Sequence, residues 1–468
     1  MADQILGLTT GASFGTTTYH NRNHRRRVFH DHPTGAAPLT GLLSLMETED
    51  VDSPDDFGWW EKRFDQPETT INDASDVPFN RWDNGTTDGA DPINFTSTYS
   101  AAASTGNPYN NIAIQLASST GFQVGQVIMI IDAALDSGAT QNLRFVVTGV
   151  DTYVANQILC RSLETVTGVS NSADDQNDKS VVVIGSAHSE GATALTGTVR
   201  LPVKHTNHTQ IFRNAFSFTR TALKHPTDFD SSGIYKEKAK DNAIDHMVEM
   251  ELAFLYGVKG QQNIVVDGET LPERTTGGVR YFLEQWEAAN STYRGGSGAA
   301  AVTLNSDANK RIINFSTGSV AWKDFNDYIE RAFRVTNNRA FEKLVLCGNG
   351  FLAAINTALE NRAVTNKNFR SETVYGINIT TWESPFGTLH FKTHPLLNRS
   401  AAWRNDAIIL DVQNLKFRPL NDSDTTLLKN RQSNGQDRRK DEWLTEAGLE
   451  CRFPESHMWF ENLQTITI

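Results

Sequence analysis

The densest group of potential metal ligands in the chain is a set of four histidines near the N-terminus: His20, His24, His30 and His32. Imidazoles can bind zinc, but no cysteine and no pair of carboxylates completes a tetrahedral ligand set here. The arginines among them, Arg25, Arg26 and Arg27, would repel a cation. A basic arm that contacts phosphate or an acidic neighbouring subunit is the better interpretation. We therefore expect no metal site and no cofactor.

Two other short segments carry residue types found in catalytic or phosphate-binding sites. Residues 187–191 contain histidine, serine and glutamate, but neighbouring side chains of one short loop cannot adopt triad geometry. The run Gly348–Gly350 resembles a phosphate-binding turn without its third glycine, and capping of a helix by Asn349 explains it adequately. The chain also lacks the Walker, nucleophile-elbow and H-E-x-x-H motifs. We therefore expect no enzymatic activity.

Length and composition narrow the class of protein. A chain of 468 residues is long enough for two to four domains, and its net charge of −12 argues against tight binding of nucleic acid. No run approaches the ~20 apolar residues that span a bilayer, and no secretory signal is recognisable, so we expect no membrane partner. The three cysteines Cys160, Cys347 and Cys451 lie far apart in apolar runs, which indicates reduced thiols in a cytoplasmic environment.

The most informative part of the sequence joins a strand to one long helix. Phe212 and Arg213 belong to this strand, in which aromatic and polar residues are interleaved. The helical pattern over 234–256 would be roughly 35 Å long. We expect Met247 on its apolar side and Gly257 in the left-handed conformation that ends helices. A strand and a helix of this length indicate contacts beyond the chain's own core, and therefore assembly.

The remaining pattern predicts an α+β chain with an all-β insertion. The paired tryptophans Trp59 and Trp60 follow a short helical pattern and indicate burial against a neighbouring surface. Alternating apolar residues predict short strands within 111–200, which we interpret as one compact β-barrel or sandwich. Further helices are predicted over 320–335 and 349–359, and further strands over 343–348, 376–382, 388–394, 407–412 and 449–453, the last with Glu450 on its polar side.

In this order the elements resemble the major capsid proteins of tailed double-stranded DNA bacteriophages, whose shell fold is shared with encapsulins. Residues 39–64 look like the end of the N-terminal arm, and residues 121–191 look like the β-insertion that some members carry in the extended loop. Residues 207–257 look like the returning strand of that loop and the spine helix. Residues 344–420 look like the axial domain.

The resemblance implies a division of the chain into six parts. These are an N-terminal arm (1–60), an extended loop (61–110 and 201–230), an inserted β-barrel or sandwich (111–200), a peripheral domain with the spine helix (231–340), an axial domain (341–425) and a C-terminal return to the peripheral domain (426–468). The fold class implied is the α+β tailed-phage major capsid fold.

The resemblance also implies a structural protein that assembles with itself into hexamers and pentamers of an icosahedral shell. The shell would enclose the phage genome in the virion after assembly in the host bacterial cytoplasm. Portal protein and scaffolding or decoration proteins are further expected partners, and contact with packaged double-stranded DNA should be weak and non-specific. The candidate contacts between subunits are Trp59, Trp60, Arg25, Arg26, Arg27, Phe212 and Arg213.

Other functions remain open, and the chain departs from some family members. The alternatives are an encapsulin-like compartment around protein cargo and a β-rich carbohydrate-active enzyme with two carboxylates across a cleft. No lysine occurs between Lys62 and Lys179, so we expect no covalent cross-link from that part of the loop. The short, Gly-rich start of the chain leads us to expect a separate scaffolding protein, if one is needed. No lysine or arginine occurs from Trp82 to Leu143, and we expect this stretch and the insertion on the outer face.

Overall fold

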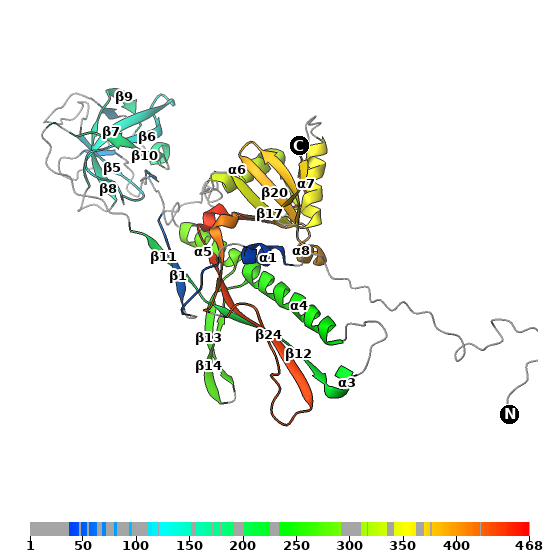
Figure 1. Ribbon diagram of the computed structural model, residues 1–468. Helices are drawn as coiled ribbons and strands as arrows, with labels where there is room; N and C mark the ends of the chain where they lie inside the picture. Colours follow the sequence, from blue (N-terminus) through cyan, green and yellow to red (C-terminus); the bar gives the residue numbers. More distant parts are fainter. Residues whose placement is uncertain are drawn as a thin grey trace, which may run out of the picture. The chain divides into compact units, whose positions relative to one another are not determined.

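The computed structural model describes residues 37–45, 48–53, 56–62, 68–71, 79–81, 93–95, 111–119, 121–150, 156–170, 173–177, 179–188, 190, 201–224, 234–266, 268–291, 310–315, 317–334, 341–361, 369–374, 377–421 and 423–467. The chain divides into two compact units (Figure 1). The first comprises Met1–Trp59, Lys204–Glu287 and Lys310–Ile468. The second comprises Trp60–Val203 and Ala288–Asn309.

A seven-stranded antiparallel sheet forms the centre of the second unit. Its strand order is β2 (Glu68–Thr70), β10 (Ser180–Ser186), β6 (Gln126–Ala134), β7 (Thr140–Val150), β8 (Gln157–Ser162), β5 (Asn111–Gln115) and β3 (Phe79–Arg81). A separate pair consists of β4 (Ile93–Phe95) and β9 (Val166–Val169), and α2 (Ala173–Gln176) is a short helix. Alternate residues such as Ile128 and Ile130 are fully buried, as the period of a strand requires. The sheet also includes β2 and β3, which precede residue 111. The division of the chain with an insertion over 111–200 stays a prediction.

A four-stranded sheet and the long helix form one part of the first unit. The sheet contains β12 (Gln210–Thr219), β24 (Arg438–Cys451), β22 (Leu415–Pro419) and β23 (Thr426–Leu428). β12 pairs with β24 along its whole length, from Gln210 opposite Ala447 to Thr219 opposite Arg438. The helix α4 (Ile234–Tyr256) packs on this sheet. The sequence predicts that this strand makes contacts beyond the chain's own core, but in the structure it pairs with a strand of the same chain.

Shorter elements surround this sheet. They are α1 (Pro38–Leu45), α3 (Arg220–Lys224), α5 (Val279–Ser291), the pair β1 (Phe57–Glu61) with β11 (Val203–Asn207), and the hairpin of β13 (Gly260–Val266) and β14 (Glu269–Thr275). In Figure 1 the hairpin and the connection between β23 and β24 are separate projections of the first unit.

A mixed seven-stranded sheet forms the other part of the first unit. Its order is β15 (Ile312–Asn314), β25 (Met458–Glu461), β21 (Ala407–Leu410), β17 (Glu342–Cys347), β20 (Gly387–Thr393), β19 (Ile377–Ser384) and β18 (Phe369–Val374). The helices α6 (Trp322–Arg334), α7 (Asn349–Asn361) and α8 (Pro395–Arg399) accompany it, as do the 3-10 turns η3 (Val412–Asn414) and η4 (Pro454–Ser456). A parallel pair, β16 (Ser319–Ala321) and β26 (Thr465–Thr467), lies beside it.

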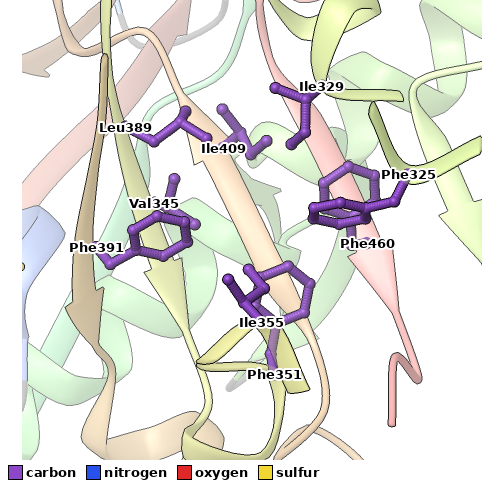
Figure 2. A pocket seen from close by; sticks show the side chains of 9 residues that line it. All are labelled: Phe325, Ile329, Val345, Phe351, Ile355, Leu389, Phe391, Ile409 and Phe460. Atoms are coloured by element: carbon purple, nitrogen blue, oxygen red, sulfur yellow. The ribbon is translucent and has the colours of Figure 1, made fainter. Parts of the chain in front are cut away.

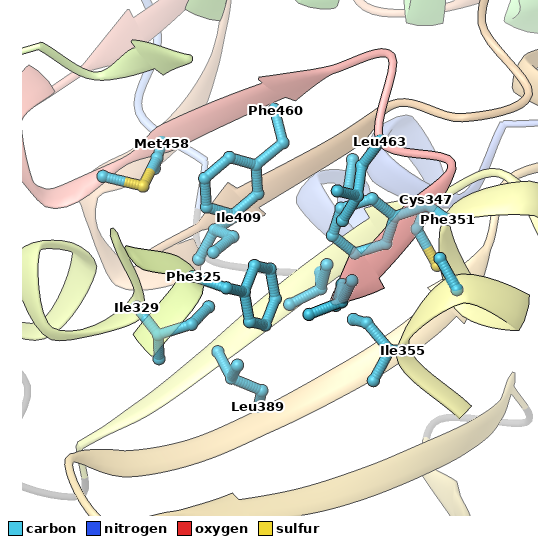
Figure 3. Packing of buried hydrophobic residues seen from close by; sticks show 14 of the residues in the cluster. Phe325, Ile329, Cys347, Phe351, Ile355, Leu389, Ile409, Met458, Phe460 and Leu463 are labelled. Atoms are coloured by element: carbon cyan, nitrogen blue, oxygen red, sulfur yellow. The ribbon is translucent and has the colours of Figure 1, made fainter. Parts of the chain in front are cut away.

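The central strands of this mixed sheet, such as β21 and β25, are buried on both faces, which explains their nearly continuous apolar sequences. Side chains of one face, such as Ile409 and Phe460, pack with α6 and α7 (Figure 3). Side chains of the other face, such as Ile408 and Trp459, pack with the cluster that includes α1 and α4. In Figure 2 nine apolar side chains from α6, α7 and four strands converge, and no polar side chain lies among them. This space therefore belongs to the core.

Two helix predictions need correction. The buried residues of α4 are His246, Met250, Glu251, Phe254 and Leu255, whereas Met247 is 48% exposed. The predicted apolar side is wrong because a histidine and a glutamate, both satisfied by hydrogen bonds, occupy the buried stripe. The helix predicted over 320–335 begins at Trp322, since residues 319–321 form β16.

The conformation predicted for Gly257 is also wrong. Gly257 is not among the described glycines with positive φ. A Cβ atom at this position would instead lie 2.4 Å from the carbonyl oxygen of Ala253 and 2.6 Å from that of Thr276. Glycine is required here by the close approach of two backbone segments.

The cap of α7 and the face of Glu450 differ from the predictions as well. The side-chain oxygen of Asn398 in α8 accepts from the backbone N–H of Asn349 (2.6 Å), while Asn349 Oδ1 accepts from Asn398 Nδ2 (3.0 Å). The cap therefore comes from a distant residue. Glu450 is fully buried, and its carboxylate binds Arg418 (2.9 Å) and Arg452.

Candidate functional site

The segments with residue types of catalytic sites serve structural purposes where they are described. Of residues 187–191, Ser189 and Gly191 lie outside the described residues. A Cβ atom on Gly348 would lie 2.2 Å from the carbonyl oxygen of Arg404, so close packing explains this glycine. The N–H of Gly350 donates to that same oxygen (3.0 Å) and is not available to a phosphate. Within the described part of the chain, no group of three or more His, Cys, Asp or Glu side chains could hold a metal ion.

The two tryptophans of β1 have opposite environments because adjacent strand residues face opposite ways. Trp59 is only 6% exposed, with its ring 5.6 Å from the ring of Phe282 and stacked on His205 at 6.1 Å. The side chain of Trp59 therefore belongs to the chain's own core, and a contact of Trp59 with a neighbouring subunit stays a prediction. Trp60 is 66% exposed.

The strand paired with β1, and the residues just before it, also carry exposed apolar side chains. β1 pairs with β11, which begins at Val203. Val203 is exposed, and so is Leu201 just before it. We call Trp60, Leu201 and Val203 the ribbon patch. Exposed large apolar side chains on paired strands are typical of surfaces that bind another protein.

Phe212 and Arg213 also differ in their exposure. Phe212 is 4% exposed and packs edge-on against the ring of Phe254 at 6.2 Å, within the chain's own core. A contact of Phe212 with a neighbouring subunit stays a prediction. The guanidinium of Arg213 is half-exposed and binds the Glu442 carboxylate at 3.0 Å. Burial opposes ionisation of Glu442, but the hydrogen bonds and charges of Arg213 and Arg431 prevail and hold the pKa of this carboxyl below its usual value. Arg25, Arg26 and Arg27 lie outside the described residues.

A buried carboxylate joins three elements, and sequence reasoning missed it. Glu251 of α4 is fully buried and accepts from the backbone N–H groups of Leu39 (2.9 Å) and Thr40 (2.6 Å) and from the Thr40 hydroxyl (2.6 Å). These N–H groups are the unpaired donors at the start of α1. His394 Nε2 lies 2.9 Å from the same carboxylate, while His394 Nδ1 accepts from the N–H of Leu396. A charged residue on an otherwise buried helix stripe was the signal in the sequence.

The hairpin of β13 and β14 was missed as well. Its sheet has only these two strands, and Ile264, Val265 and Leu271 are exposed on it. The Asp-Gly pair at 267–268 lies between two short strand-like segments and is a recognised signal that could have predicted the hairpin. Among the described helices, none is long and apolar enough to cross a membrane.

Comparisons with known proteins place these features in a family. A family model described as SU10 major capsid protein matches residues 9–464. The major capsid protein of Pseudomonas phage PaMx41 is 26% identical over 240 residues, which are 51% of this chain and 51% of that protein. The chain thus spans about half the length of the curated relative that it matches.

Solved structures that are similar to this chain include a phage capsid and an encapsulin. The capsid asymmetric unit of cyanophage A-1(L) is 13% identical with a TM-score of 0.37, covering 60% of this chain and 85% of that one. The SrpI encapsulin of Synechococcus elongatus PCC 7942 is 9% identical with a TM-score of 0.34, covering 57% of this chain and 77% of that one.

The family model covers nearly the whole chain and confirms the predicted resemblance to tailed-phage major capsid proteins and the predicted fold class. The chain belongs to the family of the SU10 major capsid protein.

Proposed function

We propose that this chain is the structural subunit of a phage head and assembles with itself into the hexamers and pentamers of an icosahedral shell. The shell encloses the double-stranded DNA genome, and the subunit performs no chemistry on a substrate. Family membership supports the proposal, and the exposed Trp60 on the β1–β11 pair is the observation that carries it. Subunits of a ring or shell repeat one heterologous contact many times, so one apolar anchor per subunit contributes at every interface.

The size of the Trp60 contribution follows from its exposure. A tryptophan buries about 150–250 Å² when it is covered. Covering the exposed 66% of Trp60 would therefore contribute about 2.5–4 kcal/mol per contact at about 25 cal/mol per Å². A contribution of this size is typical of a residue that dominates an interface. Leu201 and Val203 are further exposed apolar side chains, both in one segment of the chain.

The experiment compares the full-length protein with its Trp60→Ala variant. Size-exclusion chromatography and negative-stain imaging of the purified wild type are expected to show closed shells. We expect Trp60→Ala to raise the protein concentration needed for assembly about a hundredfold. Its circular dichroism spectrum should not change, because the removed side chain is mostly in solvent.

Two further variants serve as controls. Leu163→Ala removes an exposed apolar side chain outside the ribbon patch and should assemble like the wild type. Trp59→Ala empties a buried site and should destabilise the subunit itself by about 3–5 kcal/mol. A wild type that stays a monomer at every concentration, or a Trp60→Ala variant that assembles normally, would contradict the proposal. Protein cargo in place of nuclease-protected DNA would favour the encapsulin-like alternative.

Further parts of the proposal concern partners and place. We propose that portal and scaffolding or decoration proteins join the shell, that DNA contact is weak and non-specific, and that assembly takes place in the host cytoplasm before the protein resides in the virion. Arg213 and the arm residues Arg25, Arg26 and Arg27 are proposed contacts between subunits. We also propose the six-part division of the chain, no cross-link from the loop between Lys62 and Lys179, and an outward-facing insertion. A map of the assembled shell tests the division and the facing of the insertion.

A further inference from the structure

No third strand pairs with the β13–β14 hairpin within the described part of the chain. Its seven residue pairs run without a bulge from Gly260 opposite Thr275 to Val266 opposite Glu269. All residues of β14 except Arg274 are exposed, as are residues 261–265 of β13. A two-stranded hairpin with both faces in water is at best marginally stable. Its persistence in a folded chain is explained if another surface covers it.

One face of the hairpin has a distinctive composition. Ile264 and Leu271 are direct cross-strand partners and therefore lie on the same face. Glu269 and Glu273 lie two residues to either side of Leu271 on that face, about 13 Å apart. The face thus has an apolar centre between two carboxylates. A complementary surface must offer cations at a similar spacing.

The first unit offers such cations at the end of its four-stranded sheet. Residues 429–440, which connect β23 to β24 and form the first three residues of β24, contain five basic residues and one acidic residue in a chain of net charge −12. Arg431 and Arg439 are held by Glu442 (3.1 Å) and Asp441 (2.8 Å). Lys429 and Arg438 are exposed and form no ion pair with another described residue, although Arg438 Nε donates to Gln436 (2.7 Å).

The helix α3 begins at the same end of the four-stranded sheet. Thr219 pairs with Arg438, and the exposed Arg220 follows it directly, with the exposed Lys224 one turn later. We call Lys429, Arg438, Arg220 and Lys224 the basic tip. Asp437 is the acidic residue beside it. Figure 1 shows the hairpin and the basic tip as separate projections, so the hairpin of one chain does not cover the tip of that same chain.

We propose that the Ile264–Leu271 face of the hairpin docks on the basic tip of a second copy of this chain, with Glu269 and Glu273 facing its cations. The proposal rests on the proposed self-assembly and names a contact for it. Donor and acceptor are different surfaces of one subunit, so the contact is heterologous and can repeat around a ring. The charges select the partner and its register, and the apolar pair excludes water between them.

The test is a charge exchange in the full-length protein. Glu269→Lys with Glu273→Lys, and separately Lys429→Glu with Arg438→Glu, should each raise the concentration needed for assembly about tenfold. The protein that carries all four substitutions should return to within about threefold of the wild type. Thr270→Lys with Pro272→Lys adds charge to the opposite face of the hairpin and should have no such effect. All these positions are exposed, so the fold should not change, which circular dichroism verifies.

The outcomes separate this contact from the shell function. Shells from the wild type with no effect of either reversal would overturn the contact and leave the shell function intact. A wild type that forms no shells would overturn the shell function first. The contact would also be overturned if the variant with all four substitutions needs as high a concentration for assembly as the two double variants do. A third result would overturn it too: the Lys429→Glu/Arg438→Glu variant no longer binds a double-stranded DNA fragment, while the Glu269→Lys/Glu273→Lys variant assembles normally. The basic tip would then bind DNA and not a second copy of the chain.

Discussion

Replacement of Glu251 by glutamine should release α1 from α4. Each carboxylate oxygen of Glu251 accepts two hydrogen bonds, from Leu39 N–H and His394 on one side and from the N–H and hydroxyl of Thr40 on the other. In Glu251→Gln, an NH₂ group replaces one of these oxygens and faces two donors. Each buried donor left without an acceptor costs about 1–3 kcal/mol, so the expected loss is about 2–6 kcal/mol. A typical domain has only about 5–15 kcal/mol of stability.

Amide hydrogen exchange measures this loss locally, and it does not require the two units to unfold together. Exchange of the Leu39 and Thr40 amides reports the opening free energy of the start of α1. At the middle of the expected range, about 4 kcal/mol, their exchange should accelerate about a thousandfold. Amides of β6 and β7 in the second unit should not change.

Two controls make the measurement decisive. Glu249→Gln makes the same substitution on the same helix, but Glu249 is exposed, and its carboxylate accepts a hydrogen bond from Asn214 Nδ2 (2.9 Å). In Glu249→Gln the Leu39 and Thr40 amides should exchange at nearly the wild-type rate. Thr40→Val removes one hydroxyl donor and leaves the carboxylate three partners, so we expect the opening free energy of the start of α1 to fall by only about 1 kcal/mol. Equal exchange rates in Glu251→Gln and Glu249→Gln would refute the reasoning.

Two other predictions concern a pair of glycines and the buried His457. Gly257→Ala places a Cβ atom 2.4 Å from the Ala253 oxygen and should destabilise the subunit by about 1–3 kcal/mol in chemical denaturation. Gly41→Ala, where nothing lies within 4 Å, should instead stabilise α1 by about 0.5–1 kcal/mol, and the reverse order would contradict this account. Burial, with the charge of Lys343, lowers the pKa of His457 to about 3 from 6.5, so the unfolded chain takes up a proton that the folded chain does not, and stability falls as pH drops below 6.5. At pH 5 this loss of stability should be about 2 kcal/mol smaller in His457→Asn than in the wild type. Burial chiefly raises the pKa of Asp406 to about 6, so Asp406 changes the stability in the opposite direction as pH falls. Its effect is the same in both proteins and cancels in the difference.

The sequence by itself determined the local elements and the family. The apolar period of α6 places Phe325, Ile329 and Phe333 on one buried face, as predicted, because a helix repeats every 3.6 residues whatever surrounds it. The apolar run at 407–410 predicted a strand, and all four residues are buried. The order of these local elements along the chain was sufficient for the family resemblance, which the family model confirms.

Only the tertiary structure decided which surfaces are free. Strand alternation says that Trp59 and Trp60 face opposite ways, but it does not say which one the core covers. The pairing of β12 with β24 and the burial of Glu251 against Leu39 join residues more than 200 positions apart. No local period records such contacts, because they depend on how whole elements pack. The burial of Trp59 and Phe212 in the chain's own core was therefore visible only in the fold, as was the exposure of the hairpin and the basic tip.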